Sequence, residues 1–234
     1  MRFRIEGPVF ERFPELSIGV VVACGIDNHG TKEMVRAFRE AQIARVREAW
    51  SHARLDADPR VTVWREAYRA FGARPKKHRS SVENLIRTVL DGRSFTSINP
   101  AVDLYNAISL KHEIPAGGDD LDCVCGDIRL TMATGDERFV PLNGRESVSP
   151  RQGEVVYRDD EDVLCRRWNW RECEKSKLTE ASTNLCLVVE GLPPVSADPV
   201  RRIATELADG IEGACGGRTS VRIVDGTMPE IDLR

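Results

Sequence analysis

The sequence predicts a mixed α/β (α+β) fold in which helices pack on a central sheet. Short runs rich in β-branched residues are typical of strands, whereas other segments repeat their apolar residues with the period of an amphipathic helix. These segments follow one another in the mixed order strand, helices, several strands, helix, strand. No linker rich in proline, glycine or serine divides the chain, so we expect a single domain over residues 1–234.

The N-terminal part is predicted to contain one strand followed by helices. Residues 16–23, LSIGVVVA, form an apolar run rich in β-branched residues, which predicts a buried strand. Apolar residues at helical spacing predict helices over 31–50 and 62–71, and Gly72 ends the second of these helices.

Two further helices have clear start signals. Ser80 and Glu83 have the spacing of a capping box, and the apolar pattern that follows them continues to Gly92. The asparagine–proline pair at 99–100 supplies an N-cap and a proline in the first helical turn. This helix is predicted to run to about Lys111.

Strands are predicted to dominate after a glycine- and aspartate-rich loop at 116–122. A last helix is predicted to start at the aspartate–proline pair at 198–199. The predicted strands begin near residues 127, 153, 162, 184 and 220.

Composition limits the classes of function and the compartment. The formal net charge of −3 indicates that any contact with nucleic acid comes from a local basic patch. Seven irregularly spaced cysteines are typical of reduced cytosolic thiols. The N-terminus lacks the apolar core of a secretory signal, and no apolar run approaches the roughly 18 residues of a membrane span. We therefore expect a cytoplasmic protein that has no membrane partner.

The sequence predicts neither a metal site nor a cofactor. Cys123 and Cys125 are separated by one residue, and Cys165 and Cys173 stand eight apart. Structural zinc sites usually space such pairs by about two to four residues. The chain also lacks a G-x-S-x-G nucleophile motif, a glycine-rich phosphate loop and a dinucleotide-binding fingerprint.

The predicted helix over 100–111 carries a polar face that includes Asp103 and Asn106. These side chains are either solvated or line a pocket, where they would bind an amino group or ribose hydroxyls. Tyr105 beside them is either a core residue or part of the wall of that pocket.

The stretch 164–180, LCRRWNWRECEKSKLTE, places two tryptophans among cations and carboxylates. If it begins as a strand, Arg166 and Trp168 face one side and Arg167 the other. It is either a solvated loop of mixed charge or the mouth of a site. Such a mouth would bind phosphates with its cations and a positive ligand group with a carboxylate. The basic loop RPKKHR at 74–79 would extend the same patch.

Several long motifs resemble the stand-alone B3/B4 domain proteins, which are relatives of the editing domain in the bacterial phenylalanyl-tRNA synthetase β chain. The resemblance is collinear over a motif core of about residues 61–192, and residues 1–60 are expected to pack on that core as a strand and helix. The motifs are RSSVENLI (79–86), INPAVDLYNAISL (98–110), IPAGGDDLD (114–122), GDIRL (126–130), GEVVY (153–157) and VLCRRWNWRECEKSKLTEASTNLCLVVEGL (163–192).

The resemblance implies an editing-domain fold whose substrate pocket lies between helix and sheet. It also implies an enzyme that acts in trans, hydrolyses the ester of a mischarged tRNA and releases the amino acid and intact tRNA. The chain is similar to the type that clears canavanine from tRNA(Arg), so canavanyl-tRNA(Arg) is the expected substrate and tRNA the expected partner. The alternatives are a non-catalytic module that binds aminoacyl-tRNA or an amino acid, and a small-molecule esterase.

The resemblance further implies roles for individual residues. Asn106 matches the asparagine of the family's editing pocket and is, with Tyr105, the expected catalytic group. Glu174 is expected to bind the side chain of the wrong amino acid. Gly117 occupies the position of a synthetase histidine, which argues against a histidine-dependent mechanism and would enlarge the pocket. The other expected substrate-binding residues are Glu172, Asp119, Asp120, Asp103 and Trp168, and the expected tRNA-binding residues are Arg79, Lys77, Lys76, Arg166, Arg167 and Lys175.

Overall fold

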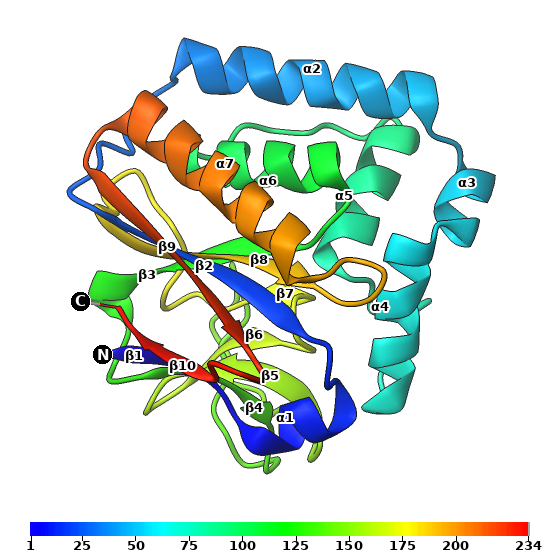
Figure 1. Ribbon diagram of the computed structural model, residues 1–234, viewed down its shortest axis with the longest axis vertical. Coiled ribbons are helices and arrows are strands. Elements are labelled where there is room, and N and C mark those ends of the chain that lie inside the picture. Colours follow the sequence, from blue (N-terminus) through cyan, green and yellow to red (C-terminus); the bar gives the residue numbers. More distant parts are fainter. Residues whose placement is uncertain (234) are drawn as a thin grey trace.

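The strands form two sheets that lie face to face beneath a layer of helices (Figure 1). The computed structural model describes residues 1–233, and it confirms the mixed α+β class but replaces the expected central sheet with two sheets. The four-stranded sheet is antiparallel, with the order β3 (Ala116–Asp120), β8 (Asn184–Gly191), β2 (Ser17–Cys24), β9 (Arg218–Asp225). The six-stranded sheet, which is parallel only between β1 and β4, has the order β10 (Glu230–Asp232), β1 (Arg2–Ile5), β4 (Ile128–Met132), β5 (Val155–Arg158), β6 (Val163–Arg166), β7 (Arg171–Glu172).

Helices cover the face of the four-stranded sheet that points away from the other sheet (Figure 1). α7 (Ala197–Cys215) packs on this sheet next to α6 (Pro100–His112), and α2 (Glu33–Ala49) packs on α6. No helix within residues 1–233 combines the length and the apolar character needed to cross a bilayer. The remaining helices are α1 (Gly7–Arg12), α3 (His52–Ala57), α4 (Pro59–Ala70) and α5 (Ser81–Leu90).

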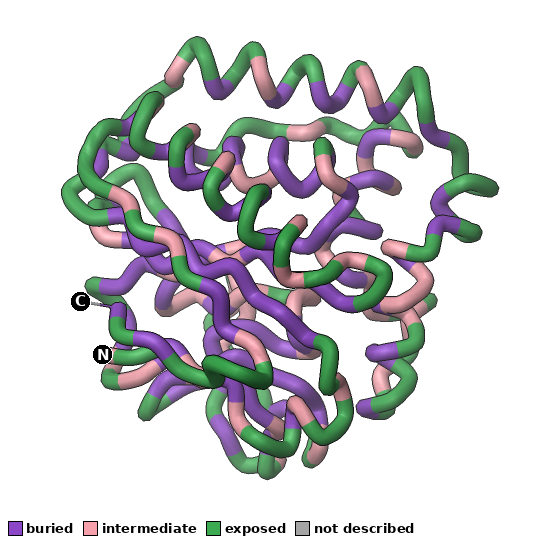
Figure 2. Tube along the Cα trace, in the orientation of Figure 1, coloured by how far each residue is buried: buried purple, intermediate pink, exposed green. Residues whose placement is uncertain are grey.

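The alternation of side chains along β8 explains why the four-stranded sheet lies in the middle of the molecule. Leu185, Leu187 and Val189 pack with the helices. Cys186 and Glu190, on the opposite face of the strand, point toward the six-stranded sheet. Both faces of β8 are therefore covered, and Figure 2 shows buried positions concentrated along the central strands and the inner sides of the helices.

Local sequence patterns predict most of the helices and the first strand correctly. The predicted strand at 16–23 and the helices at 31–50, 62–71, 80–92 and 99–111 correspond to β2, α2, α4, α5 and α6. The N-cap predicted for α6 is confirmed, because the Asn99 side chain accepts the backbone N–H of Val102 at 3.0 Å. The capping box predicted for α5 is wrong. Ser80 makes no side-chain cap hydrogen bond, and Glu83 forms ion pairs with Arg65 and Arg87 instead.

The predicted loop at 116–122 is also wrong, since most of it forms the edge strand β3. Glycine and aspartate are poor strand formers, so tertiary pairing with β8 overrides the local preference. Gly118 is required for this pairing. A Cβ atom at Gly118 would collide with the Leu187 side chain and lie 2.8 Å from the carbonyl oxygen of Cys186.

Replacing Gly118 by alanine is expected to lower the free energy of unfolding by about 1–3 kcal/mol, because the added methyl group overpacks the contact between β3 and β8. Urea denaturation measures this loss. Gly117→Ala is the matched control. Its Cβ would meet only Oε1 of Glu172, at 3.2 Å, so a much smaller loss is expected. Equal stability of Gly118→Ala and the wild-type protein would contradict the packing described here.

Candidate functional site

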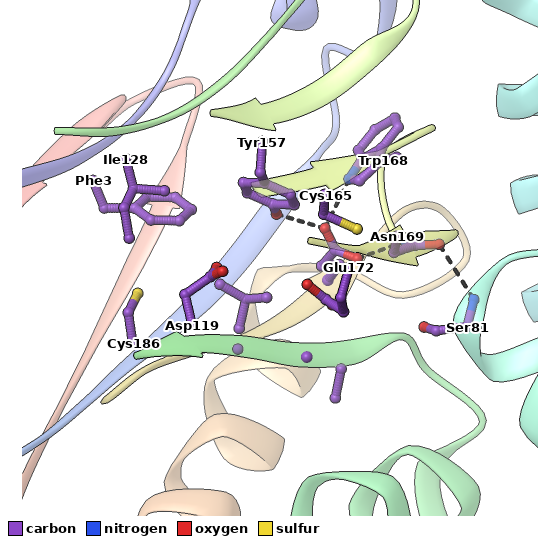
Figure 3. Close-up of a pocket in the computed structure, with 15 residues that line it drawn as sticks. Phe3, Ser81, Asp119, Ile128, Tyr157, Cys165, Trp168, Asn169, Glu172 and Cys186 are labelled. Carbon is purple, nitrogen blue, oxygen red and sulfur yellow. Dashed lines mark hydrogen bonds between the residues drawn. The ribbon is translucent and has the colours of Figure 1, made fainter. Parts of the chain in front are cut away.

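A small cavity of about 30 Å³, here named the inner chamber, lies between the two sheets (Figure 3). The four-stranded sheet supplies one wall and the six-stranded sheet the other, because both turn polar side chains toward the gap between them. The residues that define the chamber are Gly117, Asp119, Cys186, Val188 and Glu190 from β3 and β8, Tyr157, Cys165 and Glu172 from β5, β6 and β7, and Trp168 and Asn169 from the turn between β6 and β7.

A second cavity of about 420 Å³, here named the vestibule, adjoins the chamber. It lies between α5, α6 and the β6–β7 hairpin, and its lining includes Tyr105 and Asn106 from α6 and the cations Lys77, Arg79 and Arg171. The two cavities share the lining residues Ser81, Ala116, Asn169 and Glu172. The two cavities therefore meet at these four residues.

Glu190 lies at the back of the chamber in a network of hydrogen bonds. Its carboxylate accepts from Tyr157 Oη at 2.5 Å, Trp168 Nε1 at 2.8 Å and Asn169 Nδ2 at 2.6 Å. Burial raises the pKa of Glu190 to about 7, although these three donors favour the ionised form. Asn169 is itself fixed, because its Oδ1 accepts from Tyr68 Oη at 2.9 Å.

Asp119 and Glu172 point into the same space from opposite walls (Figure 3). Burial raises the pKa of Asp119 to about 6, against the hydrogen bond that its Oδ1 accepts from Ser176 Oγ at 2.5 Å. Burial and the charges of Asp119 and Glu190 hold the pKa of Glu172 well above its ordinary value. None of the described residues that line the chamber is basic, so its three carboxyl groups have no cationic partner there. A positively charged ligand would supply that partner.

The turn that carries Trp168 into the chamber has an unusual backbone. Arg167 and Trp168 both have positive φ angles, 48° and 66°, which are rare for residues other than glycine. The backbone N–H of Trp168 donates to the carbonyl of Val155 at 2.7 Å, which helps to hold this conformation. Residues in this region cost about 1–3 kcal/mol each and are typical of functional sites.

Replacing Asp119 by asparagine is expected to stabilise the unliganded protein at about pH 8. The folded protein binds the Asp119 proton more tightly than the unfolded chain does, because the pKa rises from 3.8 to about 6 on folding. The stability that this group contributes is therefore present below about pH 4 and is lost as the pH rises through 6. The variant should gain about 1–3 kcal/mol at pH 8 and nothing near pH 4, as measured by urea denaturation.

Asp209→Asn, which changes an exposed aspartate of α7, is the control for this measurement and should leave stability unchanged at both pH values. A loss of stability in Asp119→Asn at pH 8 would show that the carboxylate has a cationic partner in the free protein.

Residues 63–208, more than half of the chain, match the model of the B3/4 domain. The chain belongs to the B3/4 domain family. Among solved structures, the protein is similar to an N-terminal fragment of the phenylalanyl-tRNA synthetase β-subunit from Pyrococcus horikoshii, with a TM-score of 0.48 and 14% sequence identity. That match covers 98% of this chain and 53% of the other, so the chain spans about half the length of the fragment. No curated protein matches the sequence.

The B3/4 fold brings several of the predicted substrate residues together. Glu172, Asp119, Gly117 and Trp168 line the chamber. The predicted catalytic pair, Tyr105 and Asn106, lines the vestibule instead. The expected pocket between helix and sheet thus corresponds to the vestibule, whereas the chamber lies between two sheets, which the sequence does not predict.

Three predicted substrate residues do not line either cavity. Asp103 is buried in an ion pair with Arg39, with 2.8 Å between Oδ2 and Nη1. Asp120 faces away from the chamber, since β3 alternates, and accepts from Ser182 Oγ at 2.5 Å. Glu174 follows the end of β7, where the chain turns outward, and it pairs with Lys177.

The predicted tRNA-binding cations separate into available and occupied side chains. Lys77 and Arg79 line the vestibule, where Arg79 Nε also lies 3.7 Å from Oε1 of Glu83, and Lys76 is exposed nearby in the same loop. Arg166 is buried and forms two hydrogen bonds with Glu154, at 2.8 and 3.0 Å. The remaining two cations also have fixed neighbours: Arg167 lies over the ring of Trp170 at 4.5 Å, and Lys175 is held by Asp159, Glu161 and Asp162 at 2.8, 3.0 and 3.3 Å.

Glu190 is a chamber residue that sequence reasoning missed. It ends the apolar run NLCLVVE, where it reads as the polar end of a strand. The alternation of side chains along the strand could have identified it. Glu190 lies on the same strand face as Cys186 and Val188 and is therefore expected to be buried. Within residues 1–233 no group of three or more histidine, cysteine, aspartate or glutamate side chains is arranged to hold a metal ion.

Proposed function

We propose that this B3/4 protein is a trans-editing deacylase, which hydrolyses the ester between a wrong amino acid and its tRNA. The observation that carries the proposal is the arrangement of charge along two adjoining cavities. The chamber holds three carboxyl groups and no basic residue among those described, while the vestibule outside it presents Lys77, Arg79 and Arg171. This order suits an amino acid that enters first and an RNA whose phosphates stay outside.

The ester would lie where the two cavities meet, at Ser81, Ala116, Asn169 and Glu172. An aminoacyl ester is already activated, so a positioned water molecule and a polar group near the carbonyl are sufficient help. In this proposal the Asn106 amide orients the water or the carbonyl group. Burial raises the pKa of Tyr105, so its hydroxyl stays protonated and can donate a hydrogen bond.

The amino acid that suits the chamber best has a cationic side chain. Charge-assisted, bidentate hydrogen bonds between a guanidinium-like group and carboxylates are among the strongest polar contacts in proteins. Glu172 and Asp119, rather than Glu174, would make them here. Canavanine, an arginine analogue, fits this description, so canavanyl-tRNA(Arg) is the proposed substrate.

A panel of charged tRNAs tests the proposal. Purified protein is incubated with canavanyl-tRNA(Arg), arginyl-tRNA(Arg) and tyrosyl-tRNA(Phe), and released amino acid is measured over time. Selective release from canavanyl-tRNA(Arg), lost in Asn106→Ala, is the expected result. Binding without release would identify a non-catalytic module. Equally efficient turnover of a free canavanine ester would identify an esterase that needs no tRNA.

A further inference from the structure

A third cavity, here named the basic pocket, has a volume of about 110 Å³. It lies where the turn after α4 meets the turn between β6 and β7. Its ionisable lining residues are Arg74, Lys77, His78, Arg151, Arg167 and Glu154. The chamber and this pocket have no lining residue in common, and only Lys77 lines both this pocket and the vestibule.

The basic pocket carries an excess of positive charge. Glu154 is its one acidic residue among those described, and the carboxylate of Glu154 is already bound by Arg166 at 2.8 and 3.0 Å and by the backbone N–H of Arg167 at 3.2 Å. Within residues 1–233 no carboxylate pairs with the side chains of Arg74, Lys77 or Arg151. Burial, together with the charges of Arg166 and Arg151, lowers the pKa of Arg167 even though Arg167 Nε lies 3.6 Å from Oε2 of Glu154.

His78 adds an unpaired polar atom to this pocket. Its Nδ1 is buried and has no hydrogen-bond partner among the described residues. Burial and the charges of Arg167 and Lys77 lower the pKa of His78 to about 4, so the ring is neutral at pH 7. A neutral imidazole can carry its proton on Nδ1 and donate it to an anionic oxygen.

Trp170 connects the basic pocket with the vestibule. Its ring lines the vestibule, and the edge of His78 packs against it with ring centroids 4.5 Å apart. The guanidinium of Arg167 lies over the same ring at 4.5 Å. A single nucleic-acid strand that leaves the vestibule past Trp170 therefore reaches the basic pocket directly.

We propose that the basic pocket binds a backbone phosphate of the single-stranded 3′ end of the tRNA. The inference builds on the proposed function and names the anchor that holds the RNA while the amino acid occupies the chamber. Arg74 and Arg151 supply planar guanidinium groups without a carboxylate partner among the described residues, and such groups match the geometry of phosphate oxygens. Trp170 offers the aromatic surface on which an unpaired base stacks.

Direct binding of uncharged RNA tests the anchor separately from catalysis. The probe is a fluorescent RNA minihelix that ends in a single-stranded CCA, and its affinity is measured by anisotropy at several salt concentrations. Arg151→Gln and Arg74→Gln are each expected to weaken binding about tenfold and to lower the slope of log affinity against log salt by about one. Arg47→Gln, which removes an exposed arginine of α2 that lines neither pocket, is the matched control and should change neither quantity.

Two further probes distinguish the possible sources of the anion. One is a blunt minihelix that lacks the CCA end, and the other is inorganic phosphate. The anchor is supported if Arg151→Gln no longer affects affinity once the single-stranded end is removed. An equal effect on the blunt minihelix would place the contacted phosphate in the stem and overturn the proposal. If neither Arg74→Gln nor Arg151→Gln weakens the binding of either RNA, and inorganic phosphate binds to the wild-type pocket, the pocket is a site for free phosphate and the proposal is overturned.

The outcomes also separate this inference from the proposed function. If the wild-type protein deacylates tRNA but both arginine variants bind the minihelix with normal affinity, the RNA is anchored elsewhere. In that case only the inference fails. A protein that neither binds the minihelix nor releases amino acid is not an editing enzyme, and the anchor fails with it.

Discussion

Under the proposed function, Glu172→Gln is expected to lower kcat/KM for the release of canavanine from tRNA(Arg) about 100-fold. Glu172 lines both the chamber and the vestibule, so a cationic amino acid must pass close to it. Hydrogen bonds to charged groups contribute about 1.5–3 kcal/mol, and about 1.4 kcal/mol changes a rate tenfold. Glutamine has nearly the same shape but cannot become a carboxylate when the cation binds. Steady-state deacylation kinetics at about pH 7.5 measure the effect.

Glu174→Gln is the matched control, since it makes the same change two residues further along the chain. Glu174 accepts from the backbone N–H of Asn143 at 2.8 Å and pairs with Lys177 outside the chamber. We expect less than about a threefold change in kcat/KM, as is usual for an exposed ion pair. A large loss in Glu174→Gln with normal activity in Glu172→Gln would return recognition to Glu174.

Gly117→Val is expected to reduce deacylation by more than about 100-fold while leaving RNA affinity and stability close to those of the wild-type protein. A Cβ atom at Gly117 would lie 3.2 Å from Oε1 of Glu172, so the valine methyl groups would occupy the space that the amino acid needs. The backbone of Gly117 is not in the left-handed region, and valine favours strands, so β3 should still form. Kinetics, minihelix binding and thermal unfolding measured together test this separation.

Gly117→Ala should give a smaller loss of activity than Gly117→Val, because alanine adds only the first carbon. This order follows from volume alone and does not depend on which amino acid is bound. Full activity in Gly117→Val would mean that the substrate does not lie beside β3, and the chamber would then not be the amino-acid site.

Helices could be predicted from the sequence because their signals are local. The N-cap of α6 and the apolar periodicity of α2 need only neighbouring residues. β3 could not be predicted, because a glycine- and aspartate-rich segment becomes a strand only through pairing with β8, which lies about 70 residues away in the sequence. The same non-local pairing separates the four-stranded sheet from the six-stranded one.

The candidate site shows the same division between local and long-range information. Asn106, Asp119 and Glu172 are brought to the two cavities as the motifs suggest. The sequence could not predict which cations are free to bind RNA, because the carboxylates that pair with the others are distant in sequence. Arg166 is bound by Glu154, and Lys175 is held by carboxylates that precede it by 13 to 16 residues.

The walls of the chamber are assembled from segments that lie far apart along the chain. Phe3 in β1 and Glu190 in β8 line the same cavity, and β1 is hydrogen-bonded to both β4 and β10. Closing such long loops is slow, whereas helices form early during refolding. Helical circular dichroism should therefore recover before the proposed deacylase activity, whose return would report the final step in which the two sheets meet.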